Sequence, residues 1–363
     1  MAISPDVLAT ALQELMPAYS ELFVSWHPVL EKLVSKGNLT RETLKGPWRE
    51  FVVVTDGPGD VTLIQTGSEV IAGGRHQNAV RGSTYAPRMI YAFDVPGKDL
   101  AEANGEMDLA RILKNYPELA LSDFHERIAD QVATGNGNNV GGFVTLNGDR
   151  TYIGGGPAAR QGAFRFLTPA AQVAAGQPLR FGLDSATTPG WINQYGNITS
   201  FATNGKSTMR RVYYTCSRQG KTLGPVDLLL GDEDSYLNYI EDLDDQVRVS
   251  KVEGDKAPPN VRQGTKFLDA DFYLEDAIDT AQFGSAAAPF PGRDGVIYFM
   301  KSATWHAYTL GHDANRETKG DFAVHGPFRI PEQDLWRYEI VLMMGIHTTQ
   351  LRANGVVEGG AIP

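Results

Sequence analysis

The chain has 363 residues, of which 42% are hydrophobic and 21% charged, and it contains 39 glycines. This composition is typical of an ordered, loop-rich globular protein and excludes a disordered or collagen-like chain. The net charge of -10 argues against a basic surface that binds nucleic acid by neutralising phosphates. A lone cysteine, Cys216, excludes an internal disulfide framework and favours a reducing compartment. The N-terminus lacks the features of a secretory signal, and no apolar run approaches the ~18 residues of a membrane span, so we expect a cytosolic protein.

The first 36 residues predict two helices. Ser4-Pro5-Asp6 combines a capping serine, a proline at the first helical position and an acid in the first turn. Apolar residues then recur at steps of three and four and predict one amphipathic stripe: Leu8, Leu12, Leu15, Tyr19, Leu22 and Trp26. Pro17 is expected to kink or split this helix. A second helix is expected to stop at Lys36-Gly37-Asn38, where a basic last turn meets a capping glycine.

From Glu50 the pattern changes to β. Runs of branched and aromatic residues predict strands at 51–55, 61–64 and 89–93. The segment between the last two is polar and glycine-bearing, which predicts a long two-stranded excursion. Its tip, IAGGRHQNAVRG at 71–82, has too few apolar residues for a core of its own, and isolated hairpins are marginal in water. We therefore expect this excursion to lie on another surface.

A glycine-dense stretch, ATGNGNNVGGF at 133–143, resembles a phosphate-binding loop at first sight. A dinucleotide fingerprint requires G-x-G-x-x-G after a strand and at the start of a helix. Here the glycines follow a predicted helix, whose apolar positions are Leu121, Phe124, Ile128 and Val132. Gly135 is placed where a left-handed C-cap residue is expected. The stretch from Gly135 to Gly142 is therefore interpreted as a helix cap and hinge, not as a cofactor site.

The rest of the chain alternates between helices and strands. A helix is predicted at 205–219, a buried strand at 225–230 and a helix at 232–243, which together form an α/β layer. The final third is mostly β, with strands expected at 265–268, 271–274, 295–300, 305–310 and 338–344. The fold class is therefore α+β.

No pattern in the sequence specifies catalysis. The seven histidines fit no zinc motif, and His125 is interpreted as a surface or interface residue. Four others converge only if folding brings them together: His306, His312, His325 and His347. An acidic group could hold Mg²⁺ or Ca²⁺ through its carboxylates: Asp227, Asp232, Glu233, Asp234, Glu241, Asp242, Asp244 and Asp245. Helix physics explains part of it without metal, because Asp232 can cap a helix and the next two acids complement its N-terminus. Hydrolase elbows, Walker loops and kinase signatures are absent from the sequence. We expect no cofactor.

Several segments, taken in order, resemble the major capsid protein of tailed double-stranded DNA bacteriophages, which has the HK97-like fold. A helical arm and an extended β-loop precede a long spine helix that ends in IADQVATGNGNNVGGF, with Gly135, Gly137 and Gly142 at the family's glycine positions. PVDLLLGD followed by SYLNYI is similar to the strand and helix of the axial domain. FLDADFYLED and GVIYFMKS are similar to strands that return to the peripheral domain, and YEIVLMMGIHTTQLRANGV is similar to the family's C-terminus.

The resemblance implies an arm at 1–54, an extended β-loop at 55–98, a peripheral domain with the spine helix at 99–150, an axial domain at about 151–290 and return strands at 291–363. It implies a non-enzymatic shell protein that forms hexamers and pentamers around a phage genome, so its location is the virion, assembled in the bacterial cytoplasm. The implied partners are other copies, portal, decoration and separate scaffolding proteins, and DNA contacted non-specifically. Residues 55–97 contain no lysine and Lys98 lies at the base of the loop, so covalent self-crosslinking is not expected.

A shell requires surfaces that neighbouring copies cover and hinges that let one subunit fit two ring sizes. We expect the stripe residues Leu12, Tyr19 and Trp26, and the loop residues Arg75 and Arg81-Gly82, to contact neighbours. The expected hinges are Gly57 and Gly59 in the loop, Gly46-Pro47, and the glycines after the spine helix. Two alternatives remain open. One is an encapsulin-like compartment, and the other is a carboxylate-dependent metal enzyme that uses Asp232 and Asp234.

Overall fold

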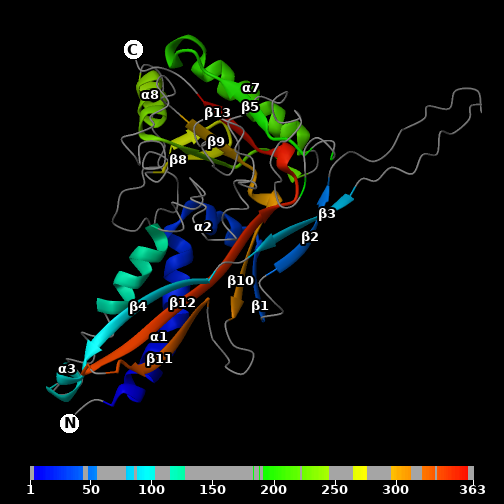
Figure 1. Ribbon diagram of the computed structural model, residues 1–363. Helices are drawn as coiled ribbons and strands as arrows, with labels where there is room; N and C mark the ends of the chain where they lie inside the picture. Colours follow the sequence, from blue (N-terminus) through cyan, green and yellow to red (C-terminus); the bar gives the residue numbers. More distant parts are fainter. Residues whose placement is uncertain are drawn as a thin grey trace, which may run out of the picture.

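Two β-sheets at opposite ends of an elongated molecule organise the chain (Figure 1). In this computed structural model the described residues are 4–43, 48–54, 79–85, 88–102, 115–126, 183, 188, 191–220, 223–244, 265–275, 296–311, 321–331 and 333–358. A small two-stranded sheet lies at the side of the molecule, near the junction of the two larger ones. The mixture of helices and sheets confirms the predicted α+β class.

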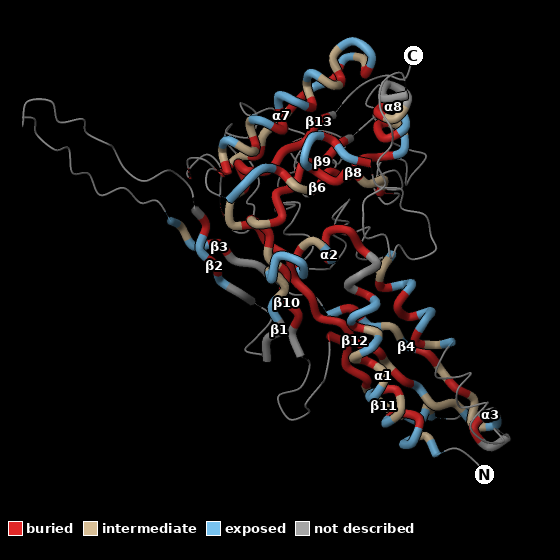
Figure 2. Tube along the Cα trace, turned by 180° about the vertical axis from the view of Figure 1, so that it is seen from behind, coloured by how far each residue is buried: buried red, intermediate tan, exposed pale blue. Residues whose placement is uncertain are grey.

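One long strand is the centre of the five-stranded sheet. The strands are β12 (Leu335–Thr348), its antiparallel partners β4 (Arg88–Pro96), β10 (Trp305–Gly311) and β11 (Phe322–Arg329), and β1 (Leu39–Thr43), which pairs parallel with β10. Alternate residues of β12 enter the main core: Tyr338, Ile340, Leu342, Met344 and Ile346. The short helix α3 (Gly97–Glu102) follows β4. Figure 2 shows the buried residues running along this strand.

The N-terminal helices do not form a free arm. Helix α1 (Pro5–Trp26) packs along β11 of its own chain, beside the helix over 115–126. The Tyr338 hydroxyl donates to the Pro5 carbonyl at 3.0 Å, and the Asp321 amide donates to Ser20 Oγ at 2.8 Å. The rings of Phe23 and Phe322 meet edge to face at 5.3 Å. The prediction of a projecting arm at 1–54 is therefore wrong for the helical part.

The predicted stripe of α1 is also partly wrong. The buried residues are Leu8, Ala9, Leu12, Met16, Ser20 and Phe23. Leu22 is 41% exposed, whereas Tyr19 packs partly buried against the core. The helix face that packs against the sheet is the buried one. It includes the polar Ser20, whose hydroxyl accepts a hydrogen bond from the Asp321 amide. Leu12 is covered by its own chain, and the Trp26 side chain lies outside the described residues.

Pro17 does not split α1. The helix runs unbroken from Pro5 to Trp26, with Pro17 inside it. A proline removes one backbone hydrogen bond, but buried side chains on both sides, Met16 and Ser20, hold the helix on the sheet. The chain leaves α1 at His27 and enters α2 (Pro28–Ser35), which ends at Lys36-Gly37 as predicted, with Gly37 at a φ of 70°.

The six-stranded sheet has both faces buried. Its order is β5 (Gln194–Asn197), β13 (Gly355–Glu358), β9 (Val296–Met300), β6 (Leu228–Gly231), β8 (Ala270–Leu274) and β7 (Thr265–Phe267). On one face Leu229, Ile297 and Phe299 belong to a cluster with α7 (Lys206–Gln219) and α8 (Glu233–Asp244), and on the other Leu228 and Tyr298 join the main core. The predicted α/β layer is confirmed. The Ser235 amide donates to Asp232 Oδ1 at 2.9 Å, so Asp232 caps α8 as predicted.

Three strands lie in a different sheet from the one predicted, and one of them is β8, from the segment FLDADFYLED, which pairs with β6. The segment 295–300 was expected to return to the peripheral domain, and the chain after residue 291 was assigned there. Instead β9 pairs with β6 and β13, and β13 pairs with β5. A continuous apolar run such as that of β9 needs cover on both faces, and the centre of the six-stranded sheet supplies it. The boundary at 291 is therefore corrected. The chain passes from the six-stranded to the five-stranded sheet between β9 and β10, and it returns between β12 and β13.

A two-stranded excursion is present, but its strands differ from those predicted, and residues 79–82 of the expected tip belong to a strand. Strands β2 (Trp48–Val54) and β3 (Ala79–Tyr85) pair antiparallel from Trp48↔Tyr85 to Val54↔Ala79. Strand β4, which had been assigned to the same excursion, belongs to the five-stranded sheet. The predicted strand at 61–64 lies outside the described residues, as do these predicted sites: Gly46-Pro47, Gly57, Gly59, Arg75, Gly135, Gly137, Gly142 and His312. The helix predicted at 117–132 is confirmed over 115–126.

Candidate interaction surfaces

The hairpin β2–β3 is anchored to the body by one aromatic side chain. Phe51 is nearly buried, and its ring lies 4.0 Å from the ring of His347 on β12, measured between centroids. On the other side it lies against Gly82, where an added Cβ would come within 2.8 Å of Phe51 Cζ. Gly82, which was predicted as part of a contact with neighbours, therefore makes room for the anchor of the hairpin. The next inward residue, Val53, is fully buried.

Two of the dispersed histidines meet beneath this anchor. His306 and His347 are direct partners on β10 and β12, and their rings stack at 5.5 Å. The ring of Tyr308 lies 6.1 Å from His347 and fits over Gly345, whose absent Cβ leaves space for it. Antiparallel pairing of distant segments brings these groups together. Sequence spacing contains no signal for it beyond the alternation of each strand.

The outer face of the hairpin is open to solvent. Val52 is 58% exposed, although its neighbours Phe51 and Val53 are both buried. Arg81, a predicted contact residue, forms an exposed ion pair with Glu50 at 3.4 Å. Such pairs contribute little to stability, so both groups are available to other partners. The hairpin thus combines a fixed inner face with an apolar and charged outer face.

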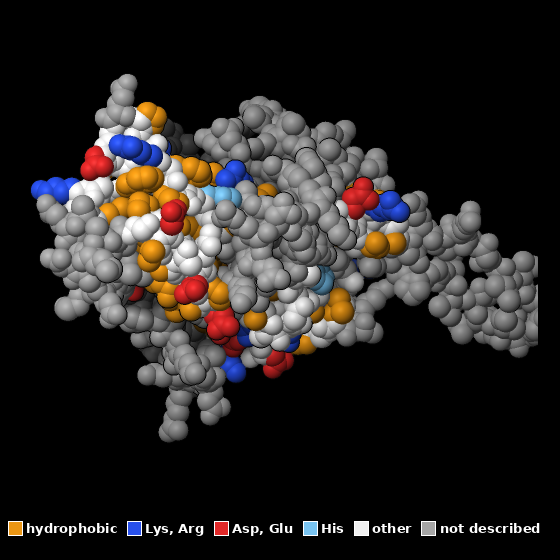
Figure 3. Space-filling model, turned by 90° about the horizontal axis from the view of Figure 1, so that it is seen from below, with side chains coloured by type: hydrophobic (Ala, Val, Ile, Leu, Met, Phe, Trp, Pro, Cys, Tyr) orange, Lys and Arg blue, Asp and Glu red, His pale blue; other side chains and the backbone are white. Residues whose placement is uncertain are grey.

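Other exposed hydrophobic residues are spread over several elements. They are Val7, Leu22, Val34, Ile90, Leu119, Tyr214, Leu223, Leu237, Leu268 and Phe328. On the face shown in Figure 3, hydrophobic, acidic and basic side chains are interspersed, and no single sign of charge dominates the coloured part. The described surface on this face therefore favours several small contacts over one large hydrophobic interface.

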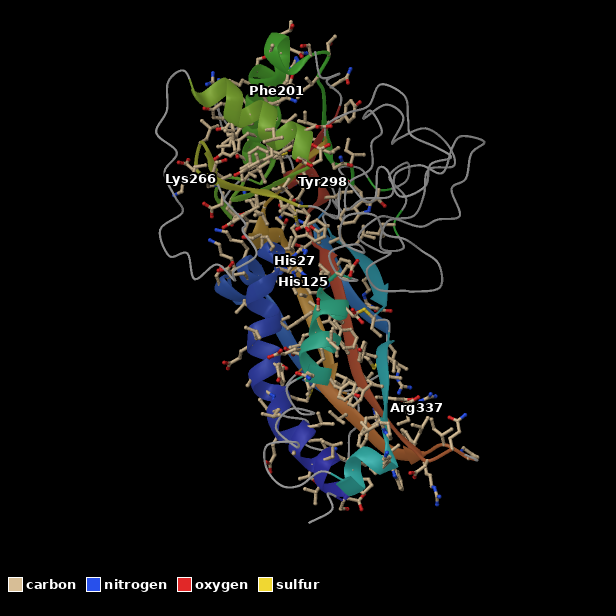
Figure 4. The ribbon with its side chains drawn as sticks, turned by 90° about the vertical axis from the view of Figure 1, so that its left-hand side faces the viewer. His27, His125, Phe201, Lys266, Tyr298 and Arg337 are labelled. Carbon is tan, nitrogen blue, oxygen red and sulfur yellow. The ribbon has the colours of Figure 1, made fainter. Side chains whose placement is uncertain are left out.

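An exposed ion pair crosses β4 and β12 at one end of the five-stranded sheet. Arg337 donates from Nε to Asp94 Oδ1 at 2.8 Å and from a terminal nitrogen to Oδ2 at 2.9 Å, at positions that are direct strand partners (Figure 4). These bonds lower the pKa of Asp94 below its ordinary value. The pair fixes the register of an edge strand without burying either charge.

Replacing Asp94 with asparagine is expected to lower the Tm at neutral pH by about 1–2 °C, because an exposed pair contributes little. The folded-state pKa is lowered, so the contribution is complete above the unfolded pKa of about 3.9 and is lost as the pH falls through the lower folded value. Thermal unfolding of both proteins at pH 7, 5 and 3 measures this. A difference that grows towards pH 3 would contradict the assignment.

The acidic residues do not assemble a metal site in the described part of the chain, where no three histidine, cysteine or carboxylate side chains lie together in a way that could hold an ion. Asp232 is a helix cap, and Asp227 accepts the Ser302 amide at 2.8 Å. Of the two carboxylates named in the metal-enzyme alternative, that of Asp232 thus has a structural role. His125 is half-buried, and its ring lies 5.9 Å from that of His27, so it faces the interior more than predicted.

Comparisons with known proteins give likeness in structure only. No known family profile matches the sequence, and no curated protein matches it. A cyanophage A-1(L) capsid structure is similar with 12% identity and a TM-score of 0.59, over 92% of this chain and 93% of that one. The capsid of a native GTA particle is similar with 11% identity and a TM-score of 0.50, over 91% of each chain.

The chain has the HK97-like fold. The hairpin β2–β3 flanks residues 55–78, which lie in the segment predicted as an extended loop, and the helix over 115–126 lies in the segment predicted as the spine helix. The SrpI encapsulin of Synechococcus elongatus is also similar, with 10% identity over 92% of this chain and 88% of that one, but its TM-score of 0.49 is too low to argue from. No helix in the described residues is long and apolar enough to span a bilayer.

Among the predicted contact residues whose side chains the structure describes, none lie together in one site. Leu12 is in the core and Tyr19 packs against it. Arg81 and Gly82 lie on opposite faces of the hairpin, with Arg81 exposed and Gly82 buried. The residues that sequence reasoning missed are Phe51 and His347, which anchor the hairpin, and Val52, which its outer face exposes. The apolar run at 51–54 predicts a strand, but nothing in it distinguishes the buried Phe51 and Val53 from the exposed Val52.

Proposed function

We propose that this chain is the major capsid protein of a tailed bacteriophage and that it assembles into hexamers and pentamers of an icosahedral shell around double-stranded DNA. The supporting observation is likeness along the whole chain, since 92% of it aligns with a cyanophage capsid structure at a TM-score of 0.59. The alignment also covers 93% of the capsid chain, so the two chains correspond over nearly their full lengths. A shell subunit without catalysis fits this arrangement.

The subunit has a large core of its own, yet it extends a hairpin beyond that core. Both sheets bury apolar faces, and the main core extends from α1 to β13. The hairpin, by contrast, buries Phe51 and Val53 but exposes Val52. Because two-stranded sheets are marginally stable alone, a second copy that covers the outer face would stabilise both molecules. A stable body with a partly covered extension suits assembly after folding.

Small contacts are sufficient for a shell. Ring contacts between identical subunits join two different patches, and each subunit takes part in several of them. Multivalency then makes the shell stable although each contact is weak. The interspersed exposed hydrophobic residues, such as Ile90 and Leu237, fit this mode of assembly better than one obligate interface does.

The further partners are those of a phage shell. We infer a separate scaffolding protein, a portal protein, decoration proteins in some particles, and DNA that is contacted without sequence preference. The net charge of -10 suits a shell whose inner wall does not hold phosphates tightly, so that DNA enters and leaves. The functional location is the virion, after assembly in the bacterial cytoplasm.

Electron microscopy of the purified chain, alone and co-expressed with the scaffolding candidate from its gene neighbourhood, tests this proposal. We expect closed particles of uniform diameter. Discrete monomers under every assembly condition would contradict it. The contents distinguish the encapsulin alternative, because a phage shell is filled with DNA in an infected cell, whereas an encapsulin encloses a cargo protein.

A further inference from the structure

Helix α2 and its N-cap residue make three polar contacts with the six-stranded sheet. Lys32 pairs with Asp271 of β8, and Lys36 Nζ lies 3.9 Å from Asp227 Oδ2 just before β6. At the other end, His27 Nε2 lies 3.7 Å from Glu275 Oε2, directly after β8. Both lysine pairs reach solvent. The His27 and Glu275 side chains, at 0% and 3% exposure, do not.

His27 has a second role, as the N-cap of α2. Its Nδ1 accepts a hydrogen bond from the Val29 amide at 3.2 Å. A ring nitrogen that accepts carries no proton, so the imidazole is neutral and its proton is on Nε2. That nitrogen is the one nearest Glu275. The capping bond thus assigns the tautomer.

The charged and titratable groups around this ring come from three elements. Glu275 follows β8, and His125 approaches from the helix over 115–126, with its ring 5.9 Å away (Figure 4). On α2 itself, Lys32 is already paired with Asp271, and Glu31 is exposed. Among the described residues, protonation of His27 therefore creates a cation that faces the buried Glu275 carboxylate and the His125 imidazole.

We propose that His27 is a pH-dependent link between the N-terminal helices and the six-stranded sheet. When His27 takes up a proton, Nδ1 becomes a donor and can no longer accept from the Val29 amide. The same proton makes the ring a cation beside Glu275, so the contact with β8 strengthens while the first turn of α2 loses its cap. Burial opposes the charged form of the ring and the adjacent Glu275 carboxylate favours it, so the exchange of partners follows a fall in pH. It concerns the joint between the sheets and does not depend on the proposed shell.

Hydrogen exchange of the full-length chain tests the exchange of partners. Amides of residues 29–36 are compared at pH 7.5 and 5.0, after correction for intrinsic rates and with light scattering to verify that the assembly state is the same. We expect protection of the first turn of α2 to fall about five- to tenfold at pH 5.0, the size of a lost cap. The peptide of α7 is the internal reference and should change by less than about twofold.

Two variants separate this link from a merely structural histidine. His27→Asn keeps a capping side chain that does not titrate, so protection of α2 should become independent of pH. Glu275→Gln removes the carboxylate that favours the cation, so the transition should move to lower pH. His125→Asn is the control that leaves both the cap and the carboxylate in place, and its transition should remain.

The proposal is overturned if α2 protection in the unaltered chain changes with pH no more than that of α7. It is also overturned if His27→Asn shows the same fall. Should His27→Asn not fold, Glu275→Gln alone decides, because an unmoved transition in that variant would exclude the exchange of partners.

Discussion

Removing residues 55–78 is expected to abolish shell formation while the subunit remains folded. The last paired residues of the hairpin are Val54 and Ala79, so an Asn-Gly turn can close the stem directly after them. Phe51 and Val53, which anchor the stem on β12, stay in place. The shortened chain therefore keeps its core and loses only residues 55–78. These include Arg75, a loop residue that we expect to contact neighbouring subunits.

Light scattering and electron microscopy measure assembly, and circular dichroism with thermal unfolding measures the fold. The expected result is a monodisperse small species whose Tm lies within about 3 °C of the unaltered chain, since surface changes away from the core have small effects. A Gly-Ser segment of the original length is the matched control for loop closure, and it should also fail to assemble. Closed shells from either chain would contradict a role for this segment in assembly.

Asn354→Leu is expected to destabilise the subunit by roughly 2–6 kcal/mol, because it leaves two buried donors without a partner, each worth about 1–3 kcal/mol. Asn354 Oδ1 accepts from the Lys301 amide at 2.8 Å and from Trp305 Nε1 at 3.0 Å. Its Nδ2 donates to Thr304 Oγ1 at 3.1 Å and to the Gln350 carbonyl at 2.9 Å. The side chain is fully buried, so water cannot replace it without rearrangement.

The position of Asn354 explains why this effect should reach both sheets. Lys301 and Trp305 lie where the chain passes from β9 to β10, and Asn354 itself lies between β12 and β13. One amide group therefore ties together the two places where the chain crosses from one large sheet to the other. Loss of the group should reduce the cooperativity of unfolding as well as its midpoint.

Denaturant unfolding of the unassembled chain, followed by tryptophan fluorescence and by circular dichroism, measures the change. Asn197→Leu is the matched control, because Asn197 is exposed and the same replacement there should change stability by less than about 0.5 kcal/mol. Asn354→Asp keeps the accepting oxygen and should be less harmful than leucine. A leucine variant within 1 kcal/mol of the unaltered chain would contradict the role given to this hydrogen-bond cluster.

Interactions between residues close in the sequence determined several helices, strands and helix caps, and local patterns predicted them. The segment 225–243 is an example, because an apolar run, a capping aspartate and acids in the first turn specify β6, the start of α8 and its cap without reference to the rest of the chain. The helix over 206–219, most of β2 and the glycine end of α2 were predicted for similar reasons. Each depends on interactions a few residues apart.

Tertiary structure alone decided which elements meet. The apolar run of β9 looks the same whether its partner is β12 or β6, and only the need to cover both faces places it in the six-stranded sheet. Packing against the sheet likewise determined which face of α1 is buried. The segment predicted as an arm thereby became part of the core. His306 meets His347, and His27 meets Glu275, because strand pairing and helix docking join segments that are distant in sequence. Such contacts depend on the packing of the whole chain, and a single sequence records no local sign of them.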